Sequence, residues 1–199
     1  MPIIASAKSD GNFLPCPAGV HDALCVFVED LGMEYSEQYK KDNHKIIICW
    51  EINEPMSDGR PYMLSQRYTL SLNEKATLRK MLEGWRGKKF TDQELTDGFD
   101  LEKLKGKQCQ IQVIHNEKNG KTYANIGAVL PKGKNSIAMT AVNTELPDWI
   151  AKVKEENAAA HAKLDHAPVV IVDAVKPAAG GAPPADDEPP FACDKLTWN

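Results

Sequence analysis

The segment GRPYMLSQRYTLSLNEKATLRKMLEGWRGKKF, residues 59–90 of this 199-residue chain, decides the predicted fold because its periodicity changes once. Apolar and polar side chains alternate over residues 60–72, which is the period of a half-buried strand. Asn73 then predicts the cap of a helix over residues 74–83, which ends before Gly84. A strand that leads directly into one helix is therefore the centre of the predicted fold.

Strand patterns lie on both sides of this centre. VHDALCVFVED, residues 20–30, and HKIIICWEIN, residues 44–53, predict two strands before it. KQCQIQVIH, residues 107–115, and KTYANIGAVL, residues 121–130, predict two strands after it. Residues 116–120 between the last two carry the Asn-Gly signal of a β-hairpin. The chain therefore presents three strands, one helix and two more strands.

This element order is that of the OB-fold, a small Greek-key barrel that binds oligonucleotides on one face. We predict a mainly β fold: a five-stranded OB-fold-like barrel with a helix between strands 3 and 4, followed by a C-terminal helix and a disordered tail. A generic small β-sandwich is the alternative, although it would not need a helix at that point. The predicted divisions are a core over residues 1–145, a helix over 146–166 and a disordered acidic tail rich in Pro and Ala over 167–199.

The charge is distributed unevenly along the chain. The whole sequence has 24 basic and 28 acidic side chains, a net charge of −4. Residues 60–134 hold 15 basic and 8 acidic side chains, a net charge of +7, which the average conceals. A solvated lysine-rich surface would also explain this block. With 42% hydrophobic residues, no long apolar run and five cysteines without close pairs, we expect a cytoplasmic protein with reduced thiols.

No catalytic or metal-binding constellation stands out. Residues 120–122 end like a phosphate loop, but His115 occupies the position of the required first glycine, and the stretch lies in a hairpin. Cys16, His21 and Cys25 lack the close ligand pair of a structural zinc site. We therefore expect no enzymatic activity, no metal and no cofactor.

The central basic block favours binding to single-stranded nucleic acid. Such binding requires cations that neutralise phosphates and aromatic faces on which bases stack. The predicted contact residues are Lys45, Arg60, Tyr62, Arg67, Trp85, Arg86, Lys88, Lys121, Tyr123 and Lys132. Arg67, on the polar face of its strand, is the strongest single candidate. Trp50 and Tyr68 fit the core better, and Trp85 fits either a contact loop or a plug at the bottom of the barrel.

The C-terminal tail suggests a protein partner. DDEPPF, residues 186–191, resembles the acidic tip of bacterial single-stranded-DNA-binding proteins, which docks on replication and repair proteins in that family. Eight residues follow Phe191, so no terminal carboxylate adjoins it, and Trp198 is a second candidate anchor. The predicted partner contacts are Asp186, Asp187, Glu188, Phe191 and Trp198.

The core carries a second resemblance. GVHDALCVFVEDLG, CWEIN, the segment 59–90 and GKTYANIGAVLP together resemble a family of phage and prophage replication or recombination proteins, over about residues 15–131. The resemblance implies a non-enzymatic OB-fold protein that coats single-stranded DNA without sequence preference in the bacterial host cytoplasm. We expect no membrane association, and a homo-oligomer is compatible with the sequence. The main alternative is a protein–protein adaptor or inhibitor that acts on a host or phage replication enzyme without binding DNA.

Overall fold

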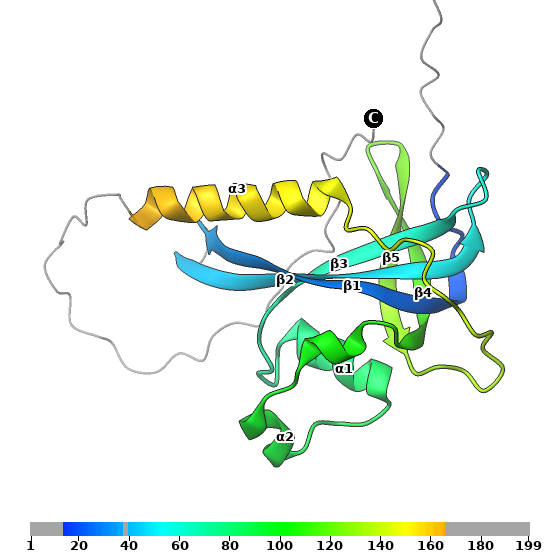
Figure 1. Cartoon of the computed structure of the whole chain (residues 1–199), viewed down its shortest axis with the longest axis horizontal. Helices are drawn as coiled ribbons and strands as arrows, with labels where there is room; N and C mark the ends of the chain where they lie inside the picture. Colours follow the sequence, from blue (N-terminus) through cyan, green and yellow to red (C-terminus); the bar gives the residue numbers. More distant parts are fainter. Residues whose placement is uncertain (1–13, 38–39, 166–199) are drawn as a thin grey trace, which may run out of the picture.

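A computed structural model of the chain describes residues 14–37 and 40–165 (Figure 1). One antiparallel sheet with the strand order β3-β2-β1-β4-β5 is formed by β1 (Gly19–Ser36), β2 (Lys41–Pro55), β3 (Pro61–Thr69), β4 (Gln108–Lys118) and β5 (Lys121–Leu130). The helical elements are α1 (Thr77–Arg86), α2 (Asp92–Asp97), the 3₁₀ turn η1 (Leu101–Leu104) and α3 (Asp148–Asp165). The prediction of a mainly β fold with five strands is confirmed, and α1 lies between the third and fourth of them.

The two edge strands of the sheet are β3 and β5, and they lie in contact. The strand pairings between described residues join β1 to β2 and β4, β2 to β3, and β4 to β5, but they do not join β3 to β5. The five predicted strands therefore form one sheet, and among the described residues no strand pairing closes it into the predicted barrel. In the same part of the chain, no helix is long and apolar enough to cross a membrane.

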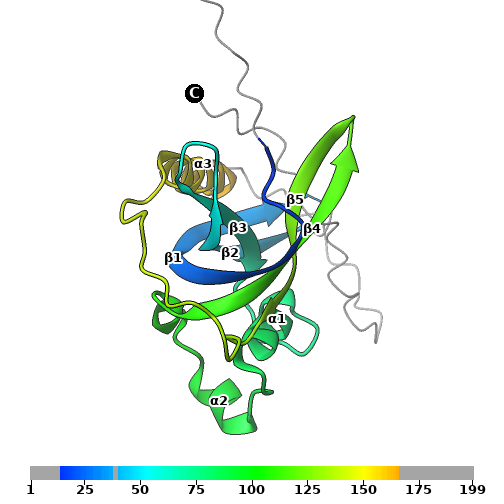
Figure 2. The ribbon, with the colours of Figure 1, turned by 90° about the vertical axis from the view of Figure 1, so that its right-hand side faces the viewer.

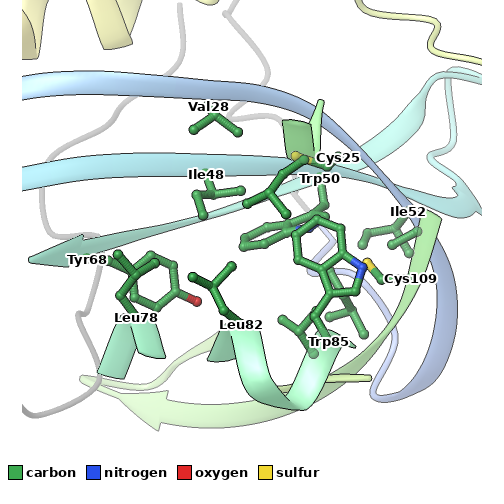
Figure 3. Packing of buried hydrophobic residues seen from close by; sticks show 14 of the residues in the cluster. Cys25, Val28, Ile48, Trp50, Ile52, Tyr68, Leu78, Leu82, Trp85 and Cys109 are labelled. Atoms are coloured by element: carbon green, nitrogen blue, oxygen red, sulfur yellow. The ribbon is translucent and has the colours of Figure 1, made fainter. Parts of the chain in front are cut away.

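The main core lies between one face of the sheet and α1 (Figure 3). One face of β2 is buried in it through four side chains: Ile46, Ile48, Trp50 and Ile52. From α1, Leu78, Leu82 and Trp85 complete the core at the spacing of one helix face. The rings of Trp50 and Trp85 lie 6.0 Å apart between centroids. Since a buried side chain of this size contributes about 1.5–3 kcal/mol, this cluster holds α1 to the sheet.

The start of α1 corrects the sequence prediction. Asn73 does not cap the helix; its carbonyl accepts a hydrogen bond from the Ala76 N–H at 2.9 Å in a preceding turn. The helix spans Thr77–Arg86 and continues through Gly84, so its predicted end at residue 83 is also wrong; Gly87, with a φ of 67°, is the C-cap. A Cβ on Gly87 would lie 3.1 Å from Pro131 Cγ. Packing of the helix against the sheet therefore overrides the local signals at both ends.

A second core lies on the other face of β1 and β2, which we call the outer face. Helix α3 runs along it, as Figures 1 and 2 show. Ile150 of α3 is fully buried among Phe27, Leu31, Ile47 and Cys49. Ile47 and Cys49 alternate with the main-core stripe, so β2 is buried on both faces. The sequence predicted the helix but not this packing.

A segment that we call the strap, residues 131–147, connects β5 to α3. Asp22 of β1 accepts hydrogen bonds from Ser136 Oγ at 2.6 Å and from the Ile137 N–H at 3.1 Å. Glu51 of β2 is 1% exposed and accepts a hydrogen bond from the Val142 N–H at 3.0 Å. Carboxylates on the strands therefore hold the strap by its backbone amides. These contacts were not predicted from the sequence.

Candidate nucleic-acid interface

Two of the predicted phosphate contacts, Lys45 and Arg60, already have partners within the chain. Lys45 is 6% exposed, and its Nζ donates a hydrogen bond to Thr69 Oγ1 at 3.0 Å. Arg60 donates from Nε and Nη2 to Asp58 Oδ2 at 2.9 and 2.7 Å, and these bonds lower the pKa of Asp58. Lys45 is part of the interior of the protein, which removes it from the candidate interface. Arg60 stays exposed, but its charge is balanced locally.

Arg86 holds a loop together instead of facing solvent. Its Nη2 donates a hydrogen bond to Glu94, and its guanidinium lies 4.3 Å from the ring centroid of Phe90 and 5.5 Å from that of Phe99. The side chain of Arg86 is only 15% exposed. An arginine that is stacked and paired in this way fixes the segment after α1 to the helix. We therefore assign Arg86 a structural role in place of the predicted nucleic-acid contact.

The aromatic candidates Tyr62 and Trp85 lie in the main core. Tyr62 is 8% exposed and Trp85 is 7% exposed, and Trp85 Nε1 donates to the Gln108 carbonyl at 3.2 Å. Neither ring offers a free face for a base. Of the two interpretations of Trp85, the structure favours the plug. Trp50 and Tyr68 are buried, as the sequence analysis expected.

Arg67 remains a candidate. It lies on β3 opposite Ile47 of β2, on the outer face and next to the part of the sheet that α3 covers. Its side chain is half-buried, and none of the described residues forms a hydrogen bond or ion pair with it. A half-buried guanidinium without a carboxylate partner favours an external anion.

Lys88 and Lys132 each follow one of two residues that lie close together. A Cβ on Gly87 would lie 3.1 Å from Pro131 Cγ. Lys132 Nζ donates to Gln108 Oε1, a neutral acceptor, and its charge adds a small contribution to the lowered pKa of Asp22. Lys88 is exposed. Hydrogen bonds from the Thr91 N–H and from Arg86 lower the pKa of Glu94, and the positive charge of Lys88 adds a smaller contribution.

The third cationic site is the β4–β5 hairpin. Its strand register places Asn116 opposite Tyr123 and Lys118 opposite Lys121, so each pair shares a face. Ile114 and Asn125 form the next pair on that face. We call this surface the hairpin face; its members are Ile114, Asn116, Lys118, Lys121, Tyr123 and Asn125. It contains two lysines, one aromatic ring and two amides, but no carboxylate.

The shape of the hairpin keeps this face accessible. β1 pairs with β4 only as far as Val113, and beyond that point the hairpin extends past the sheet (Figure 2). Asn119 and Gly120 form the turn with φ values of 53° and 72°, which agrees with the predicted Asn-Gly hairpin. Ile114 is 38% exposed and Tyr123 is half-buried. An aromatic ring with lysines beside it is the arrangement that single strands use for stacking.

The ten predicted contacts therefore separate into groups. Lys121 and Tyr123 share the hairpin face, Lys88 and Lys132 lie at the base of β5, and Arg67 lies on β3. The remaining members are paired or buried. Asn116 and Asn125 were missed, although pairing the two strands across the Asn-Gly turn places both beside Tyr123.

The predicted partner contacts in the tail, Asp186, Asp187, Glu188, Phe191 and Trp198, lie outside the described residues. Comparison with models of known protein families finds no match, and comparison with curated proteins finds no significant match.

Proposed function

We propose that this protein binds single-stranded DNA without sequence preference and without enzymatic activity, and that it acts in phage DNA replication or recombination. We also propose that its sheet is an OB-fold. The strand order supports this assignment, because β1 is shared between the two halves of the sheet and the edge strands β3 and β5 are the ones that would close a barrel. A helix between β3 and β4 fits the same architecture.

The observation that carries the proposal is the composition of the hairpin face. Tyr123 offers a ring on which a base of any identity stacks, which contributes about 1–3 kcal/mol per base. Lys121 lies two residues before it on the same face and neutralises phosphate. Asn116 and Asn125 supply neutral donors and acceptors without repelling the backbone. Stacking combined with point charges favours unpaired bases over a duplex, whose bases are already stacked.

The acidic tail completes the proposal as a site for replication or recombination proteins. This part rests on the sequence of residues 186–198 and on its resemblance to the tips described above. Four acids and two aromatic or apolar anchors in that stretch suit a basic groove with an apolar pocket.

Fluorescence anisotropy with labelled oligo-dT and a matched duplex, at two salt concentrations, tests the proposal. Wild-type protein is expected to prefer oligo-dT and to lose affinity as salt increases, because neutralised phosphates release counterions. Tyr123→Ala should weaken oligo-dT binding by roughly 5- to 100-fold, the loss of one stacked base. Lys121→Gln should reduce the slope of log affinity against log salt by about 0.7.

Lys152→Gln is the matched control, because Lys152 is exposed on α3, away from the hairpin face. Its affinity for oligo-dT should equal that of the wild type. Equal affinity for duplex and single strand would contradict the proposal, as would hairpin variants that bind like the control. Binding to neither oligonucleotide would leave the protein–protein adaptor as the better function.

A further inference from the structure

A cleft of about 300 Å³ opens where β1 and β2 meet the segment before η1. Its floor is apolar and includes Ile46, Leu70 and Phe99. Its rim carries carboxylates, among them Asp100 and Glu102. We call this feature the acidic cleft. Its volume is at the lower end of the range for ligand sites, which suits one large side chain better than a cofactor.

The acidic cleft is open because the sheet narrows at this end. β3 ends at Thr69, opposite Lys45, and β4 pairs with β1 only as far as Leu24. β1 and β2 continue beyond both neighbours as a two-stranded ribbon. The inner face of that ribbon therefore has no strand beside it among the described residues.

Exposed apolar side chains extend the cleft floor along this ribbon. Met33 pairs with His44, and Tyr35 pairs with Asp42; both partners alternate along β2 with Ile46, so all lie on the face that lines the cleft. Met33 and Tyr35 are each 37% exposed. Exposed apolar side chains beside an apolar cleft with a polar rim are typical of a protein-interaction site.

The charge around the floor has one sign, since all the titratable side chains that line the acidic cleft are carboxylates. Glu29 among them is balanced by Lys154 at 2.9 Å and by Lys105 at 3.8 Å. Asp30 contacts His44 at 2.8 Å and is still 60% exposed.

The other two carboxylates are also paired but open to solvent. Asp100 lies 3.8 Å from Lys103, and Glu102 lies 2.8 Å from Lys105. Their side chains remain 52% and 67% exposed. Exposed ion pairs of this kind contribute about 0–1 kcal/mol, so a partner's cations can take over such contacts at small cost.

We infer that the acidic cleft docks a basic segment of a protein partner. An apolar side chain of that segment enters the floor against Leu70 and Phe99, and flanking Lys or Arg side chains face Asp100 and Glu102. The same carboxylates repel phosphate, so this surface is separate from the proposed DNA interface and does not depend on it. Charge complementarity supplies the choice of partner, and the apolar floor supplies most of the binding energy.

The test titrates the full ¹⁵N-labelled chain with the blocked hexapeptide Lys-Arg-Leu-Trp-Lys-Arg and follows its amide resonances. Saturable shifts are expected at Leu70, Phe99 and Leu101. A peptide with Ser-Gly in place of Leu-Trp should bind at least tenfold more weakly, and one with Glu and Asp in place of the cations should not bind. Shifts that map elsewhere, or equal binding of all three peptides, would overturn the inference.

Variants of the cleft carboxylates test whether Asp100 and Glu102 bind the cations of the peptide. The double variant Asp100→Asn with Glu102→Gln should weaken the first peptide at least tenfold and leave oligo-dT binding unchanged. Asn retains the cap that Asp100 provides to the Glu102 N–H, so the fold is expected to persist. Glu74→Gln with Asp97→Asn is the matched control, and its peptide affinity should not change. Leu70→Ala removes part of the exposed floor and should weaken binding without removing charge.

Self-association is the remaining alternative for this surface. If the ribbon face were covered by a second copy, the mass in solution would rise with concentration, and Leu70→Ala would abolish that rise. Such a result would replace the basic partner with a homodimer and so overturn the inference. A mass independent of concentration, together with peptide shifts at the cleft, would support it.

Discussion

The two halves of this sheet present outer faces of opposite character. On β1 and β2 the outer face carries Asp22, Glu29 and Glu51, and the chain's own strap and α3 cover it. On the β4–β5 hairpin the outer face carries Lys118 and Lys121 without a carboxylate and extends beyond the sheet. The carboxylates on β1 and β2 accept hydrogen bonds from the same chain, whereas Lys121 on the hairpin is exposed and lies beside Tyr123 and the two amides.

This difference explains why the basic block of the sequence is only partly a candidate surface. The positive charge over residues 60–134 includes Arg86 and Lys105, which serve the protein's own structure. The comparison between a covered and an uncovered face can be tested by variants on each side.

Removing the anchor of α3 should give the largest effect. Ile150→Ala deletes a fully buried side chain from the second core, and we expect the free energy of unfolding to fall by about 3 kcal/mol. Urea denaturation measures this loss. The variant should also expose the Cys49 thiol, which is now 0% exposed, to a thiol reagent in the native state.

Peptide mapping separates Cys49 from the thiols of the main core, Cys25 and Cys109, which should stay protected. Burial raises the pKa of Cys49 to about 12, so its reaction in the wild type should be slow. Equal labelling of all three thiols would show global loosening and would contradict a separate second core.

Loosening the strap should have a smaller effect. Glu51→Gln replaces a buried carboxylate that accepts from the Val142 and Asn143 N–H groups with an amide whose NH₂ opposes them. We expect a loss of about 2 kcal/mol, the value of hydrogen bonds to a charged acceptor, and faster hydrogen exchange at both amides. Glu145→Gln, an exposed acid on the same strap, should change stability by less than about 0.5 kcal/mol. Equal effects of the two variants would contradict the role of Glu51.

The parts of the fold that were predicted well are those set by short-range signals. The bounds of β5 agree with the predicted strand, because the Asn-Gly turn fixes one end of it. The strand that carries Ile46 to Ile52 was predicted from its apolar run, which is typical of a buried strand.

The missed features depend on long-range packing. Ile47 and Cys49 are as apolar as their neighbours, but only the return of α3, a hundred residues later, shows that the second face is covered. In the sequence Arg86 looks like a phosphate contact, but in the structure it is paired with Glu94 and stacked on Phe90. In the same way, nothing local indicates that Glu51 accepts amides of a strap. The sequence therefore indicated which residue types could form the candidate site. Only the tertiary contacts showed which of those residues remain exposed and which are paired or buried.

Acid should weaken the strap at its other attachment. Burial opposes ionisation of Asp22, but hydrogen bonds from Ser136, Gln110 and Ile137 hold its pKa below the usual value. The stabilisation is therefore complete above the unfolded pKa of about 3.9 and is lost as the pH falls through the folded value. Asp22→Asn should lower the free energy of unfolding by about 1 kcal/mol at pH 7. In urea denaturation, the difference in this free energy between the variant and the wild type should shrink below about pH 4. If this difference in unfolding free energy stays constant down to pH 3, the charge of Asp22 does not stabilise the strap.

The turn of the uncovered hairpin should respond least, and locally. Gly120 has a φ of 72° with no atom near a Cβ placed on it, so Gly120→Ala introduces backbone strain without a clash and should cost about 1 kcal/mol. Asn119→Gly is the control, because Gly accepts the φ of 53° without strain and stability should hardly change. In both variants Cys49 should stay protected from thiol reagents, in contrast with Ile150→Ala. Labelling of Cys49 in Gly120→Ala would mean that the two halves of the sheet open together, and the division between a structural face and a binding face would then be wrong.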